Sequence, residues 1–151
     1  MVSPELLQGL ACLRSYNAEQ VRKLAEISEL KDCPAETYVY QANDAADALY
    51  LVLSGRVAVE MDLPRHRKIV VDFVEGGDFF GWSALVPPHV LTASCLCMEQ
   101  SRLLRIPREP LLKLLKEDVS LKASIMEMIS RLVAVRLKDT RLQMSYLLGW
   151  D

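Results

Sequence analysis

The sequence predicts a mainly β domain, a sandwich or a barrel, flanked by helices, and three observations support this fold class. Short β-rich segments separated by turn signals recur between residues 36 and 106. Helical periodicity precedes them over about residues 3–30 and follows them over about residues 108–148. The chain has 151 residues without a repeat or a linker, so we expect a single domain over residues 1–151.

The N-terminal segment is expected to be helical. Asn17 followed by Gln20 is typical of a capping box, in which each side chain bonds the backbone of the other residue. A helical stripe follows it, made of Val21, Leu24, Ala25 and Ile27. Earlier leucines also fit one face of a helix, and the sequence at residues 32–34 (DCP) is expected to end the segment.

The middle of the chain is expected to form the strands. Residues 49–53 and 56–61 predict two strands joined by a tight hairpin, in which Gly55 supplies a positive φ angle. Further strands are expected at residues 37–40, 65–74, 91–98 and 102–106.

The C-terminal segment is expected to form two helices. Pro107 suits the first turn of the first helix. A second helical pattern runs from residue 119 to about 148, and about 25–30 residues at 1.5 Å each would approach 40 Å. Such a helix overruns a compact domain of this size. It either covers its own barrel or pairs with the same helix of a second subunit, and the persistence of apolar positions to Leu142 favours a homodimer.

Composition disfavours several classes of function. Eighteen basic against twenty acidic residues give a net charge of −2, which argues against direct binding of nucleic acid. The longest apolar run, residues 48–53, is too short to cross a membrane, and no secretory signal is visible. The four cysteines form no C-x-x-C pair and are expected to be buried thiols, which is consistent with a cytoplasmic protein. His66 and His89 lie in no metal-ligand spacing, and no catalytic motif is present, so we expect neither a metal site nor an enzyme.

Five segments in register resemble one family. Residues 49–57 (LYLVLSGRV) resemble the Y-x-V-x-x-G-x-V pattern of cyclic nucleotide-binding domains, and residues 76–81 (GGDFFG) resemble the G-D-x-F-G that opens their phosphate-binding cassette. Residues 83–85, 92–94 and 103–107 resemble the cassette helix, the strand that closes the cassette and the strand that enters the next helix. The chain is therefore similar to the Crp/Fnr class of sensor domains. The resemblance implies a double-stranded β-helix, a jelly-roll-like barrel, with N-terminal helices and a long C-terminal helix.

The resemblance also implies a binding site, in which this sequence departs from the family. The family's ribose-binding glutamate falls on Trp82, and its phosphate-binding arginine falls on Leu91. Glycine and the start of the cassette helix still offer backbone N–H groups to an anion. The expected ligand-binding residues are Gly81, Trp82, Ser83, Ala84, Leu91, Thr92, Ala93 and Ser94. Trp82 either plugs the vacated pocket or presents its ring to a planar ligand.

The expected function is regulatory and non-catalytic. We expect a sensing module for a small anionic, nucleotide-like effector such as a cyclic nucleotide, which changes how the C-terminal helices pack. Two alternatives remain: a ligand-free structural or dimerisation module with a degenerate pocket plugged by Trp82, and the sensor half of a Crp/Fnr transcription regulator. The DNA-reading part of those regulators would follow the long helix, so residues 1–151 are not expected to bind DNA directly.

Overall fold

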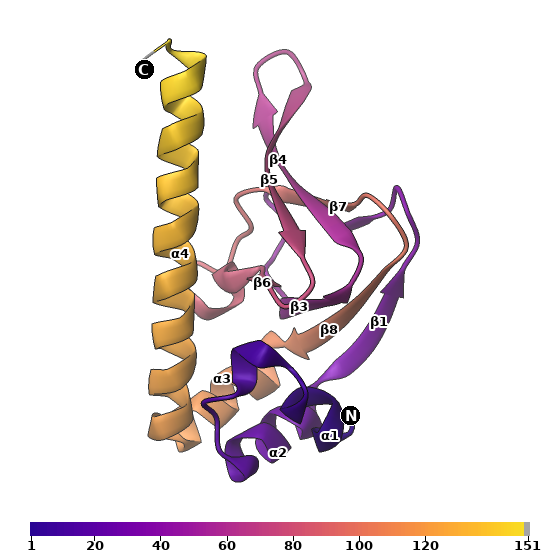
Figure 1. Cartoon of the computed structure of the whole chain (residues 1–151), viewed down its shortest axis with the longest axis vertical. Helices are drawn as coiled ribbons and strands as arrows, with labels where there is room; N and C mark the ends of the chain where they lie inside the picture. Colours follow the sequence, from indigo (N-terminus) through magenta and orange to yellow (C-terminus); the bar gives the residue numbers. More distant parts are fainter. Residues whose placement is uncertain (150–151) are drawn as a thin grey trace.

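The computed structural model describes residues 1–149, which form two sheets with short helices at one end and a long C-terminal helix along another side (Figure 1). Helices α1 (Pro4–Gln8) and α2 (Ala18–Ile27), with the 3-10 turn η1 (Ala11–Leu13) between them, precede the strands. Helices α3 (Arg108–Glu117) and α4 (Val119–Leu147) follow them. The capping box of Asn17 and Gln20 is present at the start of α2. No helix in this part of the chain has both the length and the apolar character that crossing a bilayer requires.

The eight strands within the described residues form two four-stranded antiparallel sheets. The first sheet has the order β1-β8-β3-β6 and comprises Glu29–Cys33, Ser101–Pro107, Ala48–Ser54 and Phe79–Phe80. The second has the order β2-β7-β4-β5 and comprises Tyr38–Tyr40, Ser94–Cys97, Arg56–Leu63 and Arg67–Glu75. The predicted mainly β fold with a long C-terminal helix is confirmed, as two facing sheets; within residues 1–149 no sheet closes into a barrel.

The predicted hairpin at Gly55 is wrong in its pairing, although the tight turn is present. β3 pairs with β6 and β8, whereas β4 pairs with β5 and β7, so the chain changes sheet at this turn. Gly55 has φ +102°, and a Cβ there would meet the Ser101 backbone at 2.6 Å. Glycine is therefore required by a close approach between strands as well as by the positive φ angle.

The predicted N-terminal helical segment is too long at its C-terminal end. Helix α2 ends at Ile27, and residues 29–33 form β1, which pairs with β8 along its whole length. The Ser28 hydroxyl donates a hydrogen bond of 2.6 Å to the Leu24 carbonyl and so binds the last turn of α2. Four of the five β1 residues are not buried, and three of them are charged. The segment therefore lacks the alternation of apolar and polar residues by which a strand is recognised in sequence.

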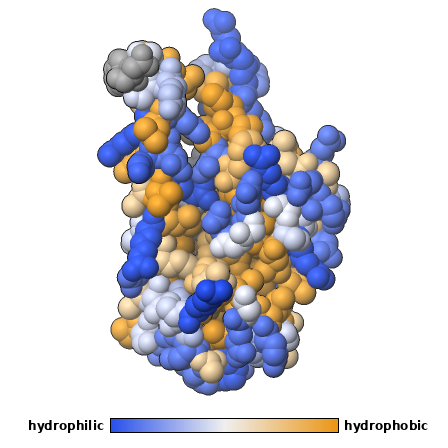
Figure 2. Space-filling model, viewed as in Figure 1, coloured by the Kyte–Doolittle hydropathy of each residue, from blue (hydrophilic) through white to orange (hydrophobic). Residues whose placement is uncertain are grey.

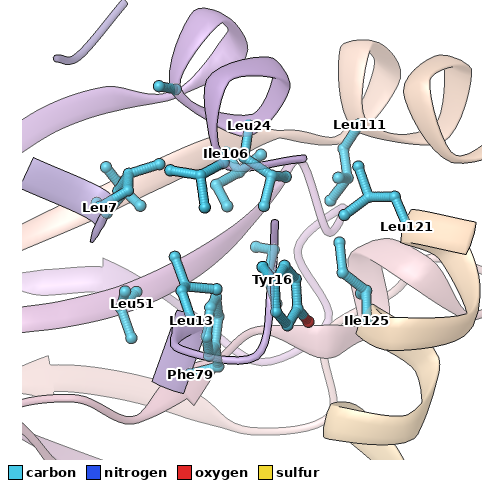
Figure 3. Close-up of a cluster of buried hydrophobic side chains, with 14 of the residues drawn as sticks. Leu7, Leu13, Tyr16, Leu24, Leu51, Phe79, Ile106, Leu111, Leu121 and Ile125 are labelled. Atoms are coloured by element: carbon cyan, nitrogen blue, oxygen red, sulfur yellow. The ribbon is translucent and has the colours of Figure 1, made fainter. Parts of the chain in front are cut away.

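Strand β3, in the interior of the first sheet, is buried on both faces. Leu49 and Leu51 point to the helices, whereas Tyr50 and Val52 point to the second sheet. This explains the apolar run at residues 48–53, since a strand covered on both sides does not alternate. Figure 3 shows the helix-side core, in which side chains of several helices converge with those of the sheet: Leu7, Leu13, Tyr16, Leu24, Leu51, Phe79, Ile106, Leu111, Leu121 and Ile125.

Helix α4 is attached to this core by its first half only. Leu121, Ile125 and Ile129 are buried, and the Asp118 side chain caps the helix by accepting the Leu121 N–H at 3.0 Å. Lys23 of α2 also contacts Asp118 at 2.9 Å. Beyond this half the helix extends alongside the hairpin of β4 and β5 (Figure 1). Charged and apolar residues alternate on its exposed surface (Figure 2).

Truncating Leu121 to alanine is expected to destabilise the fold. Its side chain is fully buried at the point where α4 joins the helix-side core, so Leu121→Ala should lower the free energy of unfolding by about 2–5 kcal/mol. Urea denaturation followed by circular dichroism measures this. Val119→Ala is the matched control, because Val119 is 74% exposed on the same turn, and its change should stay within about 0.5 kcal/mol. Equal effects would show that α4 is not held by this contact.

Candidate functional site

Gly81 in the cassette (residues 76–94) is required both by its backbone angle and by its close neighbours. Gly81 has φ +77° between β6 and the 3-10 turn η2 (Trp82–Leu85). A Cβ there would lie 3.2 Å from the Ala48 carbonyl oxygen and 3.3 Å from the Tyr50 ring. The cassette therefore packs directly on β3, and this close contact sets the direction in which η2 leaves the sheet.

A cavity of about 270 Å³ lies between the cassette, the second sheet and α4. We call it the cassette cavity. The strands contribute mainly apolar side chains from Val59, Met61, Val71 and Phe80. The cassette and α4 contribute Gly81, Trp82, Ser83, Leu91, Thr92, Ala93, Arg136 and Thr140. The site is thus an apolar chamber with a few polar groups, which is the usual composition of a small-molecule pocket.

Six of the eight residues predicted from sequence border this cavity, and Ala84 and Ser94 do not. The Ala84 N–H is used within the turn, donating to the Gly81 carbonyl at 3.2 Å, and its methyl group is buried against Leu91. The Ser94 hydroxyl is buried and accepts the Ala42 N–H at 2.9 Å. Ala84 and Ser94 therefore maintain the shape of the cassette. The N–H groups of Trp82 and Ser83 come before the first hydrogen bond of η2, so that turn does not use them.

Trp82 lines the cavity without filling it. Its side chain is half-buried, packs against the helix-side core, and leaves the chamber open beside it. His89 is directed elsewhere, since its Nδ1 donates to the Ser83 carbonyl at 3.1 Å. His89 is not among the residues that line the cassette cavity.

The cation of the cavity is Arg136, which sequence reasoning did not assign to the site. It lies on α4, its side chain is only 15% exposed, and its guanidinium carbon is 5.3 Å from the centre of the Trp82 ring. Its Nη1 forms an ion pair with the Asp72 carboxylate on β5. Its Nε is the one buried side-chain nitrogen or oxygen in residues 1–149 without a hydrogen-bond partner. The ion pair with Asp72 therefore leaves the buried Nε–H donor without an acceptor, which costs about 1–3 kcal/mol.

A signal for Arg136 was present in the helical spacing. Leu121, Ile125, Ile129 and Leu132 follow one another at three or four residues and face the core. Arg136 is the next residue on this stripe, and Thr140 follows it into the cavity. A cation that continues a buried stripe requires a partner or a ligand, because an isolated charge is costly to bury.

Tyr40 and Phe80, which line the cavity, belong to an aromatic cluster with Tyr50 behind them. The Tyr50 and Phe80 rings stack at 5.2 Å, and Tyr40 lies within 6.0 Å of both. The Cys95 thiol donates to the Tyr40 hydroxyl at 3.1 Å. Burial raises the pKa of Cys95 to about 12 and the pKa of Tyr40 well above its usual value. Both groups are therefore neutral near pH 7, so this wall adds no charge to the cavity.

The charges of the cavity form one pair. Asp72 is the one carboxylate and Arg136 the one cation among the side chains that line it. Within the described part of the chain, no three His, Cys, Asp or Glu side chains are arranged to hold a metal ion. What the arrangement can do chemically is bind a small molecule that combines an apolar or planar part with a negative group.

The two-sheet fold and a cavity between cassette and C-terminal helix define a class of ligand-sensing regulatory domains. The family comparison agrees with this class, because a model of the cyclic nucleotide-binding domain matches residues 30–118. The chain belongs to the cyclic nucleotide-binding domain family.

Curated relatives are longer proteins. A CRP-like cAMP-activated global transcriptional regulator of Mycobacterium tuberculosis is 22% identical over 147 residues, which make up 97% of this chain and 64% of the relative. This chain thus spans less than two thirds of that regulator's length. A cGMP-dependent protein kinase of Drosophila melanogaster is 27% identical over 100 residues, or 64% of this chain and 13% of the kinase.

Solved structures match the fold over most of the chain. A protein from Geobacter metallireducens, whose structure was solved as that of a candidate cyclic nucleotide-binding protein, has a TM-score of 0.80 and 29% identity, covering 91% of this chain and 99% of that one. The c-di-GMP responsive regulator CLP of Xanthomonas campestris has a TM-score of 0.78 and 26% identity, covering 89% and 66%. The catabolite activator protein of Thermus thermophilus has a TM-score of 0.73 and 23% identity, covering 96% and 63%.

Replacing Gly81 by alanine is expected to cost more stability than replacing Gly77. Both glycines have positive φ angles, so each substitution incurs about 1–2 kcal/mol of backbone strain. Only at Gly81 does the new methyl group also meet a backbone carbonyl at 3.2 Å, whereas nothing lies within 4 Å of a Cβ at Gly77. Denaturant unfolding of Gly81→Ala and Gly77→Ala measures the difference. Indistinguishable losses would contradict the close contact between cassette and β3.

Proposed function

We propose that this chain is a non-catalytic regulatory domain that binds a small anionic, nucleotide-like effector in the cassette cavity. The observation that carries the proposal is an open chamber of about 270 Å³ whose wall combines cassette residues with a cation from α4. A ligand-free module plugged by Trp82 is less well supported, since the ring borders the chamber and leaves it open.

The lining of the cavity supports an effector with a ring and a negative group. The Trp82 indole presents an aromatic face, and aromatic rings pair favourably with other planar groups. Apolar side chains from the second sheet would exclude water around the ring, while Arg136 would pair with the anion. Cyclic nucleotides combine these two features, and the family membership supports them as the first ligands to test.

The position of α4 supports a regulatory output. The same helix contributes Arg136 and Thr140 to the cavity and continues alongside the hairpin of β4 and β5 (Figure 1). A ligand that binds differently to two positions of this helix shifts the population between them. The M. tuberculosis relative is a transcriptional regulator that is activated by cAMP, which supports a regulatory rather than an enzymatic role for the shared region.

We also propose that α4 pairs with the α4 of a second copy. Its second half and the C-cap residue expose large apolar side chains: Val133, Val135, Leu137, Leu142, Met144, Tyr146, Leu147 and Leu148. These side chains lie outside the helix-side core, and large apolar residues exposed in such number are typical of an interaction surface. Because the chain has a net charge of −2, we propose a protein partner here and no direct contact with DNA.

Binding of an effector is expected to change the fluorescence of Trp82. In a Trp150→Phe background Trp82 is the one remaining tryptophan of the two in the sequence. Titration with cyclic AMP and cyclic GMP should change its emission saturably, with a matching heat of binding in calorimetry. Leu91→Arg restores a cation at the family's position and provides a comparison variant. Absence of any saturable signal or heat with both nucleotides would count against a nucleotide-like effector.

A charge on the exposed half of α4 is expected to weaken self-association. Leu137→Glu places a carboxylate on the apolar surface and should raise the dimer dissociation constant at least about tenfold, because a buried unpaired charge is costly. Analytical ultracentrifugation over a range of concentrations measures it. Val119→Glu introduces the same group at the exposed start of α4 and serves as the control. A wild-type chain that stays monomeric at all concentrations would refute the pairing.

A further inference from the structure

We propose that Arg136 binds the oxyanion of the effector and that Asp72 is an intramolecular competitor, which occupies Arg136 when no effector is present. This inference rests on the proposed function, because it concerns recognition and regulation at the same cavity. It assigns the anion-binding role to a residue of α4 that lies 45 positions beyond Leu91, where the family places its arginine.

The Asp72–Arg136 ion pair connects β5 and α4, two elements that are held in the fold by different contacts. Asp72 belongs to β5, which is paired with β4 along the hairpin, and Arg136 belongs to the part of α4 beyond its last buried residue, Ile129. Both side chains are largely shielded, with exposures of 29% and 15%, and both line the cassette cavity. As these are the cavity's only two charged side chains, an anionic ligand has one cation to bind and one carboxylate to displace.

The present contact uses Arg136 incompletely. A guanidinium carries five N–H donors in a planar fork, and two of them on one edge match the two oxygens of a phosphate or carboxylate. Asp72 receives a hydrogen bond from Nη1, while Nε is buried and has no acceptor in the described part of the chain. The ion pair therefore leaves the buried Nε–H without an acceptor, and a different arrangement of the side chain would supply one.

The burial of Nε indicates that the effector's anion would compete with Asp72 for Arg136, and would not bind beside an intact ion pair. Because Nε is sealed from solvent in the present orientation, an oxyanion in the cavity reaches the Nε edge only after the side chain turns. That rotation carries Nη1 away from Asp72. The effector's anion and the Asp72 carboxylate thus exclude each other, and binding breaks a link between β5 and α4.

This geometry specifies the effector's chemistry. The negative group should offer two terminal oxygens, as a phosphodiester, a phosphate or a carboxylate does, so that it can form two hydrogen bonds where Asp72 receives one. The Trp82 ring, whose centre lies 5.3 Å from the guanidinium carbon, places a planar group of the ligand next to that anion. A neutral ring has no means of displacing Asp72.

The test is a double-mutant cycle with calorimetric titration of cyclic AMP, inorganic phosphate and benzoate into the full chain. Asp72→Asn should bind the best of these probes about tenfold more tightly than wild type, because the competing charge is gone. Arg136→Gln should bind it roughly ten- to a hundredfold more weakly. In the double variant, Asp72→Asn should give no gain. The three probes separate a phosphodiester with a ring, a phosphate alone and a carboxylate with a ring.

Asp62→Asn is the matched control. Asp62 lies on the same hairpin and pairs with Lys68 at 3.6 Å, outside the cavity, so this variant removes the same charge without freeing Arg136. The affinity of Asp62→Asn for the best probe should equal that of wild type. Asp72→Ala is a second variant that removes the competing carboxylate. Equal binding to wild type and Asp72→Asn, or the same gain in Asp62→Asn, overturns the competition while the sensing function stands. Failure of every probe to bind either wild type or Asp72→Asn overturns both.

Discussion

Burial of strand β3 on both of its faces is the constraint on which the rest of this structure depends. Helices cover one face and the second sheet covers the other, so β3 can carry an unbroken apolar run. Burial of large apolar side chains is the dominant favourable term in folding, at about 1.5–3 kcal/mol for each. Because β3 is central, elements that touch it are held closely, and Gly81 brings the cassette to within van der Waals contact of Ala48 and Tyr50.

The same core sets the position of the cavity's far wall. The first half of α4 packs on the helix-side core through Leu121, Ile125 and Ile129, and this fixes which face its next turns present. Arg136 continues that face into the cassette cavity, where Asp72 and Trp82 meet it. The site is therefore formed by three parts of the chain that the core holds in register. A ligand in the cavity would therefore contact α4 directly, through Arg136 and Thr140.

The departure from the family's cassette acquires a physical meaning in this arrangement. Losing a glutamate and an arginine to Trp82 and Leu91 makes the local segment more apolar, yet the cavity as a whole still contains a guanidinium. An anion responds to a charge at a point in space, whichever element supplies it. Because the cation belongs to α4 and is already paired with a carboxylate of β5, the same residue would bind the ligand and attach the helix. An arginine in the cassette could bind the ligand, but it would not attach the helix.

The sequence by itself determined the fold class, the order of helices and strands, the capping box at Asn17 and most of the cassette, because these depend on periodicity and on residues that are neighbours in the chain. Only the tertiary structure decided the rest. Strand β1 has little apolar alternation and exists through its pairing with β8, and the turn at Gly55 joins two sheets because of partners distant in sequence. The Asp72–Arg136 pair likewise spans 64 positions. Burial and electrostatic contact depend on distance in space, and folding alone brings such residues together.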